Sequence, residues 1–147
     1  MPSFEGWCRW LLAMSIMFLC VGLVTAFAGD SFLFAPYNEQ IASLFFGGGI
    51  PAEARSLRSF FYGLLGGTIA GSYLLRAFVI AVPFRRRERW AWHASFWSTV
   101  LWFVVDSSVS IAHGAHFNVW MINLAPLLLL GVPMLLVRKE FGAREVR

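Results

Sequence analysis

Long runs of apolar residues, and not short alternating or amphipathic segments, dominate the pattern along this chain. A helix needs about 20 mostly apolar residues to cross the hydrocarbon of a bilayer, and four runs approach that length. We predict membrane-spanning helices at residues 10–28, 60–82, 90–113 and 119–137. The fold class expected is all-α: one domain, residues 1–147, built as an integral membrane four-helix bundle.

Prolines and glycines mark the boundaries of these runs. Pro51 suits the first turn of the second helix, and Pro83 is expected to end it. Gly114 predicts the turn between the third and fourth spans. Pro126 and Pro133 fall inside the fourth run, where we expect kinks that neighbouring helices make tolerable.

The segment between the first two spans, residues 29–59, is neither a polar loop nor a span. It holds several phenylalanines and leucines that are too apolar for free solvent and too interrupted to cross a membrane. We predict a short interfacial helix near residues 38–46, lying on the outer (exoplasmic) face. Such a helix would cover whatever the bundle encloses.

The composition also indicates a protein that is surrounded by lipid. The chain is 59% hydrophobic and only 14% charged, whereas a soluble domain is about 25% charged. The formal charge of +4 raises nucleic-acid binding as a hypothesis, but the basic residues lie at the ends of the apolar runs, where topology explains them. We expect no nucleic-acid partner. The partners we expect are membrane lipids.

Basic residues near the spans fall mainly on one side of a four-pass chain, and short loops rich in Arg and Lys stay in the cytoplasm. Arg55 and Arg58 are the exceptions on the other side. We therefore predict a multi-pass protein with N- and C-termini cytoplasmic. The residues on the cytoplasmic side are Arg9, Arg85, Arg86, Arg87, Arg89, Arg138, Lys139, Arg144 and Arg147.

The third span places its polar and amphipathic residues on one face, since each helical residue turns 100°. Asp106 lies about 10 Å from the outer end, where a bare carboxylate costs about 2.5–3.5 kcal/mol on insertion scales. A residue at that depth usually has a partner or a function. The residues of this face are Ser95, Thr99, Trp102, Asp106, Ser110 and His113.

Candidate partners for Asp106 follow from depth in the bundle. We expect one set of residues to bind a ligand, to handle a proton or simply to join the helices: Thr68, Asp106, Ser110, His113, His116, Asn118 and Asn123. A closed metal site needs four ligands. His113 and His116 with Asp106 supply three, so no metal site is predicted, and the sequence names no cofactor and no catalytic residue.

Span two carries glycines at four-residue spacing, Gly63, Gly67 and Gly71. Such a small-residue groove lets another helix approach closely, and we expect it to pack within the monomer, with packing between two copies as the alternative. Arg76 lies beside this groove, about two turns from the cytoplasmic end. We expect its side chain to snorkel toward the headgroups.

Four segments, residues 66–71, 87–92, 106–108 and 113–118, resemble those of small uncharacterised four-pass bacterial membrane proteins. The architecture is more distantly similar to that of DoxX-like proteins. The resemblance implies a bacterial inner membrane and a four-helix bundle, and it carries no activity.

Three functions stay open from the sequence. The first is a binding or accessory protein with an outward-facing polar pocket, which holds a small amphiphile or docks to a larger membrane complex or a second copy. The second is a membrane-embedded enzyme on a lipid or quinone-like substrate, with Asp106 and His113 exchanging protons. The third is transport of protons or small ions by an oligomer.

Overall fold

The computed structural model describes residues 3–142 and is helical throughout its regular elements in that range. Four helices are long and apolar enough to cross a membrane, as predicted. They are α1 (Phe4–Ala28), α3 with its continuation η2 (Ala52–Phe84), α4 (Arg89–Ala112) and a fourth, segmented helix (His116–Leu136). Arg144 and Arg147, counted above among the cytoplasmic residues, lie outside the described residues.

Prolines are accommodated by wide π-type turns. The helix α3 (Ala52–Val79) continues as η2 (Ile80–Phe84), which contains Pro83, so it runs two residues beyond the predicted end. A wide turn relieves the clash between the proline ring and the preceding carbonyls. The fourth helix contains two such wide turns. Its pieces are α5 (His116–Asn118), η3 (Val119–Asn123), α6 (Leu124–Pro126), η4 (Leu127–Gly131) and α7 (Val132–Leu136).

The closest backbone approach joins α1 to α3. A Cβ added at Gly66 would lie 2.4 Å from both the Gly22 carbonyl oxygen and the Ala26 backbone nitrogen. Only glycine fits there, and the two helices are in direct backbone contact. The predicted groove is a different one: a Cβ at Gly63, Gly67 or Gly71 would meet nothing within 4 Å among the described residues. The expectation that this groove packs within the monomer is therefore wrong for the described chain, and packing between copies stays a prediction.

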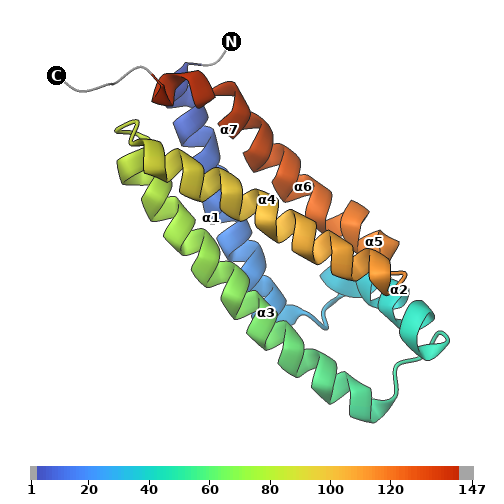
Figure 1. Ribbon diagram of the computed structural model, residues 1–147. Helices are drawn as coiled ribbons and strands as arrows, with labels where there is room; N and C mark the ends of the chain where they lie inside the picture. The colour runs from blue at the N-terminus through green and yellow to red at the C-terminus, as the bar shows by residue number, and fades with distance from the viewer. Residues whose placement is uncertain (1–2, 143–147) are drawn as a thin grey trace.

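The densest core lies where the loop of residues 85–88 meets both described ends of the chain, which we call the arginine-loop end (Figure 1). Rings of Phe4, Phe84 and Phe141 stack and cross there, Phe141 being carried by η5 (Arg138–Phe141). The Trp92 indole N–H donates to the Met134 carbonyl at 2.8 Å. Buried side chains from all four long helices complete this core: Cys8, Leu11, Phe18, Ile80, Phe84, Trp92, Leu130, Met134 and Val137.

At the opposite end, the α2 end, α3 and α4 have diverged and a short helix crosses between them (Figure 1). The predicted short helix is present as α2 (Ala35–Phe46), preceded by η1 (Phe32–Phe34). It begins three residues earlier than predicted, because Pro36 suits its first turn. Gly47, at φ 65°, ends it in the left-handed conformation. Large apolar side chains there remain exposed: Phe32, Leu33, Leu44, Phe45 and Phe46.

Candidate functional site

A hydrogen-bonded cluster surrounds Asp106 near the α2 end. Its Oδ1 accepts from the Asn118 and Asn123 side-chain amides, each at 2.7 Å. The Ser110 hydroxyl lies 3.3 Å from Oδ1 and donates its proton to the Asp106 main-chain carbonyl at 2.7 Å. Asn123 is fully buried and is carried on the wide turn η3, which packs against α4. Four of the predicted site residues are therefore brought together by α4 and the fourth helix.

Ser107 belongs to the same cluster and was not among the predicted residues. Its hydroxyl oxygen lies 3.1 Å from the Asn123 amide nitrogen, and the Asn118 amide also donates to the Ser110 hydroxyl at 2.8 Å. Ser107 is one residue from Asp106, a 100° turn away from the stripe that the helical wheel selected. It is included because the fourth helix packs to one side of that stripe.

The Asp106 carboxylate is satisfied on one oxygen. Among residues 3–142, every hydrogen bond that it accepts falls on Oδ1, and the residue is partly exposed. The ion pairs of the same range involve Arg9, Arg58, Arg85 and Arg87, so none neutralises Asp106. The donors fix the orientation of the carboxylate and leave Oδ2 able to accept from a ligand.

Tyr37 of α2 extends the cluster across the chain. Its hydroxyl donates to Asn118 Oδ1 at 2.9 Å, and its ring meets Phe117 edge-on with centroids 5.3 Å apart. Burial, with smaller contributions from nearby Tyr62 and Asp106, raises the pKa of Tyr37 to about 12. The hydroxyl therefore remains a proton donor at neutral pH. Sequence reasoning missed Tyr37, because 81 positions separate it from Asn118.

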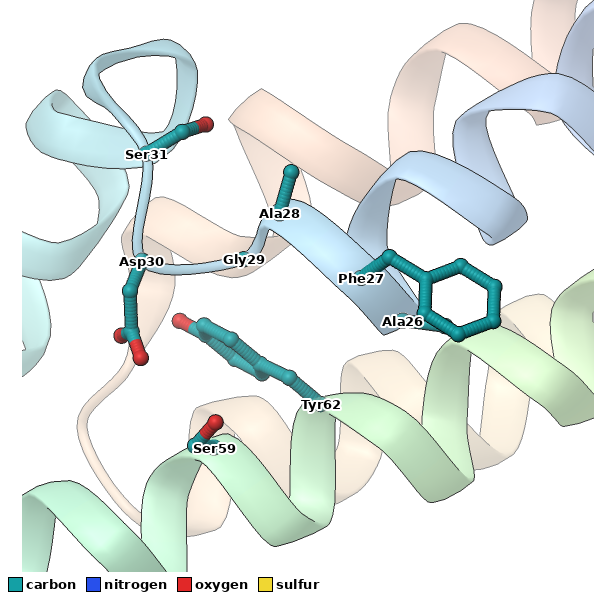
Figure 2. Close-up of a pocket in the computed structure, with 8 residues that line it drawn as sticks. All are labelled: Ala26, Phe27, Ala28, Gly29, Asp30, Ser31, Ser59 and Tyr62. Atoms are coloured by element: carbon teal, nitrogen blue, oxygen red, sulfur yellow. The ribbon is translucent and has the colours of Figure 1, made fainter.

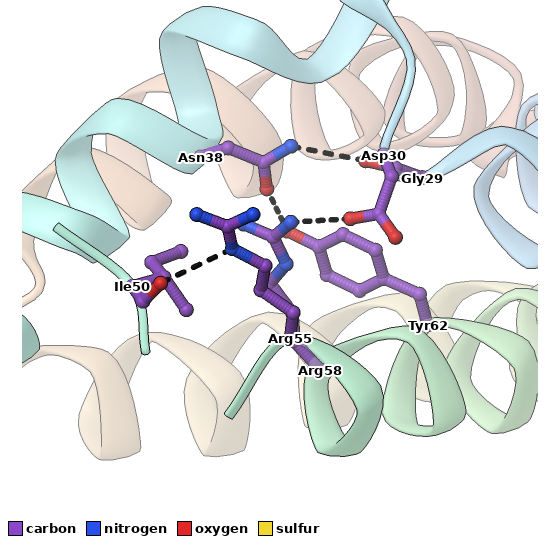
Figure 3. Close-up of polar contacts among 7 residues, drawn as sticks. All are labelled: Gly29, Asp30, Asn38, Ile50, Arg55, Arg58 and Tyr62. Carbon is purple, nitrogen blue, oxygen red and sulfur yellow. Dashed lines mark hydrogen bonds and ion pairs between the residues drawn. The ribbon is translucent and has the colours of Figure 1, made fainter. Parts of the chain in front are cut away.

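The neighbouring residue, Asn38, ties α2 to the other helix pair (Figure 3). Its Oδ1 accepts from the Tyr62 hydroxyl of α3 at 2.6 Å, and its amide donates to the Gly29 carbonyl at the end of α1 at 3.0 Å. An Asp30–Arg58 ion pair lies beside these bonds. Two consecutive residues of α2 thus connect the α1–α3 pair to the pair formed by α4 and the fourth helix.

Two hollows in the described chain lie away from the Asp106 cluster. A hollow of about 320 Å³ is formed where α1 ends against α3, with Tyr62 and Ser59 facing the turn after α1 (Figure 2). Its lining is Ala26, Phe27, Ala28, Gly29, Asp30, Ser31, Ser59 and Tyr62. A second hollow, of about 480 Å³, lies at the arginine-loop end among Ser3, Phe4, Glu5, Arg85, Arg87 and Glu140. Neither hollow is lined by a predicted site residue, so an outward-facing pocket at Asp106 stays a prediction.

Three predicted residues do not join the cluster. The His113 ring turns back on its own helix, with Nδ1 3.0 Å from the Val109 carbonyl oxygen, and the side chain is exposed. His116 is exposed as well. Thr68 donates to the Leu64 carbonyl at 2.9 Å on an exposed part of α3, because α3 has diverged from α4 at that level (Figure 1). No group of three or more potential metal ligands occurs within residues 3–142.

Arg76 does not snorkel toward the arginine-loop end as expected. Its guanidinium donates to the Thr99 hydroxyl at 2.7 Å and to the Ser98 hydroxyl at 3.0 Å, and it lies 5.6 Å from the Tyr73 ring centroid. Helical side chains lean toward the N-terminus of their helix. For α3 the N-terminus is at the α2 end, so Arg76 is directed away from the arginine loop and across to α4.

In comparisons with known proteins, no family model, curated protein or solved structure matches the chain. The resemblance to small four-pass bacterial membrane proteins therefore stays a prediction. Function has to be argued from the geometry of the Asp106 cluster and of the surfaces around it.

Proposed function

We propose that this chain is a multi-pass membrane protein that binds a small amphiphile at Asp106 without converting it. The four long apolar helices support membrane insertion. The basic loop of residues 85–87, together with Arg9 and Lys139, supports a cytoplasmic position for both termini. The exposed aromatic residues around α2 support contact with the outer membrane interface. A bacterial inner membrane is proposed on the sequence resemblance.

The observation that carries this proposal is the asymmetry of the Asp106 carboxylate. Two amide donors, from Asn118 and Asn123, hold Oδ1, while Oδ2 accepts no hydrogen bond from residues 3–142. An intramembrane carboxylate without a cation is costly, and a hydroxyl or ammonium headgroup would offset that cost at Oδ2. Val105 and Val109, both more than half exposed on the adjoining side of α4, offer an apolar surface for the tail.

The enzyme hypothesis gains less support from this geometry. General acid–base work requires both groups within hydrogen-bond reach of the substrate or of a bridging water. Asp106 is oriented by asparagines of the fourth helix, whereas the exposed His113 ring is bonded to its own helix. The two side chains share no hydrogen bond in the described chain, and binding without conversion is the simpler function.

Transport through the monomer also gains less support. Ion pathways through a membrane protein are lined by polar and ionisable side chains. The polar group of Arg76, Ser98 and Thr99 lies between the Asp106 cluster and the arginine-loop end, but beyond it the interior is closed by buried Leu11, Ile80, Phe84, Leu130 and Met134. These side chains favour a site that opens toward the α2 end over one that continues through the bundle.

The test is to extract the protein with its surrounding bilayer in a styrene–maleic acid copolymer and to compare bound amphiphiles with the bulk membrane by mass spectrometry. We expect one species to be enriched severalfold in the wild type and to fall to its bulk level in Asp106→Asn. Glu39→Gln is the matched control, because it removes the same charge from an exposed position on α2 and should retain the enrichment. A wild type whose lipids match the bulk membrane would refute the proposal, and a stoichiometric protein partner would favour docking instead.

A further inference from the structure

Arg76 is the second charged side chain that the helices hold at depth. It lies about 12 Å from the end of η2 at Phe84, and its partner Thr99 lies about 15 Å along α4 from Arg89. Both values place the guanidinium well inside the hydrocarbon under the proposed topology. A cation at that depth usually marks a functional site, because its desolvation has to be offset by an anion or by hydrogen bonds.

The neighbours of Arg76 fix its position without neutralising it. The Ser98 and Thr99 hydroxyls both donate to the Ser95 carbonyl, at 3.1 and 2.9 Å, so their protons are committed to their own helix and their lone pairs accept from Arg76. No acidic residue within residues 3–142 forms an ion pair with Arg76. A guanidinium has five N–H donors, and the two hydroxyls take up two of them.

The face of α3 that carries Arg76 is open toward the α2 end. Ser72, one turn along this face, is exposed, and Leu65, three turns along, is 55% exposed. On α4, Leu101 flanks the Ser98 side of the contact and is also more than half exposed. The guanidinium therefore bridges α3 and α4, with apolar surface on both helices next to it.

We propose that Arg76, with Ser98 and Thr99, forms a binding site for the phosphate or carboxylate oxyanion of an anionic lipid. The planar guanidinium presents paired donors that match such an oxyanion, and the exposed Leu65 and Leu101 offer a surface for an acyl chain. This apolar flank is the reason to favour a lipid over a free anion. The site is separate from the Asp106 cluster, which lies two turns further along α4, and it does not depend on what Asp106 binds.

Native mass spectrometry of the detergent-purified full chain tests this site with three probes: dioleoyl phosphatidylglycerol, dioleoyl phosphatidylcholine and inorganic phosphate. Wild type is expected to retain phosphatidylglycerol about tenfold better than phosphatidylcholine, because both lipids carry a phosphate but the choline cation of phosphatidylcholine cancels its charge and repels the guanidinium. Arg76→Gln should abolish that preference. Arg86→Gln, which removes the same charge from the exposed loop, should keep it. Equal losses in the two variants would reveal general surface attraction and overturn the site.

A second variant and a displacement experiment complete the test. If Arg76→Gln does not fold, the double variant Ser98→Ala with Thr99→Val keeps the charge but removes its two acceptors, and it should weaken the preference severalfold. A wild type without preference for phosphatidylglycerol overturns the proposal without any variant. Inorganic phosphate should not displace the bound lipid, and complete displacement would overturn the lipid as the source of the oxyanion. Asp106→Asn should leave lipid retention unchanged, so failure here is distinct from failure of the amphiphile proposal.

Discussion

Replacing Gly66 by alanine is expected to weaken the contact between α1 and α3. The added Cβ would lie 2.4 Å from two backbone atoms of α1, whereas ordinary contacts of such an atom begin at 3.4 Å. Because the obstacles are backbone atoms, the helices must move apart by about 1 Å, and insertion of a methyl group into a packed contact typically costs about 1–3 kcal/mol. We expect a value in the upper half of that range.

Gly67→Ala provides a matched control. A Cβ at Gly67 would meet nothing within 4 Å, and alanine favours a helix over glycine by about 1 kcal/mol in either position. The gain in helix propensity therefore cancels in the difference between the two variants. What remains is the cost of overpacking at Gly66 alone.

The assay is reversible unfolding in mixed micelles, titrated with sodium dodecyl sulfate and followed by circular dichroism. Gly66→Ala should unfold at a clearly lower detergent fraction than wild type, and Gly67→Ala should unfold at an equal or higher one. Equal stability of the two variants would refute the backbone contact that defines the α1–α3 pair. A destabilised Gly67→Ala would instead indicate that the groove of Gly63, Gly67 and Gly71 packs against another helix, as in a dimer.

Three other predictions test the cluster and the topology. Asn123→Ala removes the fully buried amide that donates to Asp106 and Ser107 and should lower the free energy of unfolding by about 1–3 kcal/mol. The control Ser108→Ala changes an exposed residue and should leave the free energy of unfolding nearly unchanged. Tyr37→Phe keeps the ring but loses its bond to Asn118, so hydrogen exchange in α2 should accelerate about fivefold; unchanged exchange would mean that the hydroxyl does not hold α2. In intact cells, a membrane-impermeant maleimide should label Ser43→Cys and not Arg86→Cys, and the opposite pattern would invert the proposed topology.

The sequence by itself determined the number, type and approximate limits of the helices. Span length depends on the length of each apolar run, which is a local property, and the structure has four helices at the predicted positions. The short helix α2 followed from local signals as well, a proline at its start and a glycine after its end. Depth along antiparallel helices nominated Asn123 and Thr68 as partners of Asp106; the Asn123 hydrogen bond is present, whereas Thr68 donates to its own helix.

Periodicity within one helix could not decide which face meets which neighbour. Span two offered glycines on adjoining faces, and Gly66 was selected over the stripe containing Gly67 because Gly22 of α1 lies opposite it. The direction of Arg76 depended on the presence of Ser98 and Thr99 across the helix pair.

Tertiary structure alone decided that Tyr37 joins the Asp106 cluster and that His113 does not. Tyr37 joins it over 81 positions of sequence, while His113, only seven positions away, turns back to its own backbone. The physical reason is that hydrophobic run length specifies where a helix lies along its axis, whereas its rotation and crossing point are set by contacts between residues that are distant in the chain. Those contacts determine which polar side chains meet.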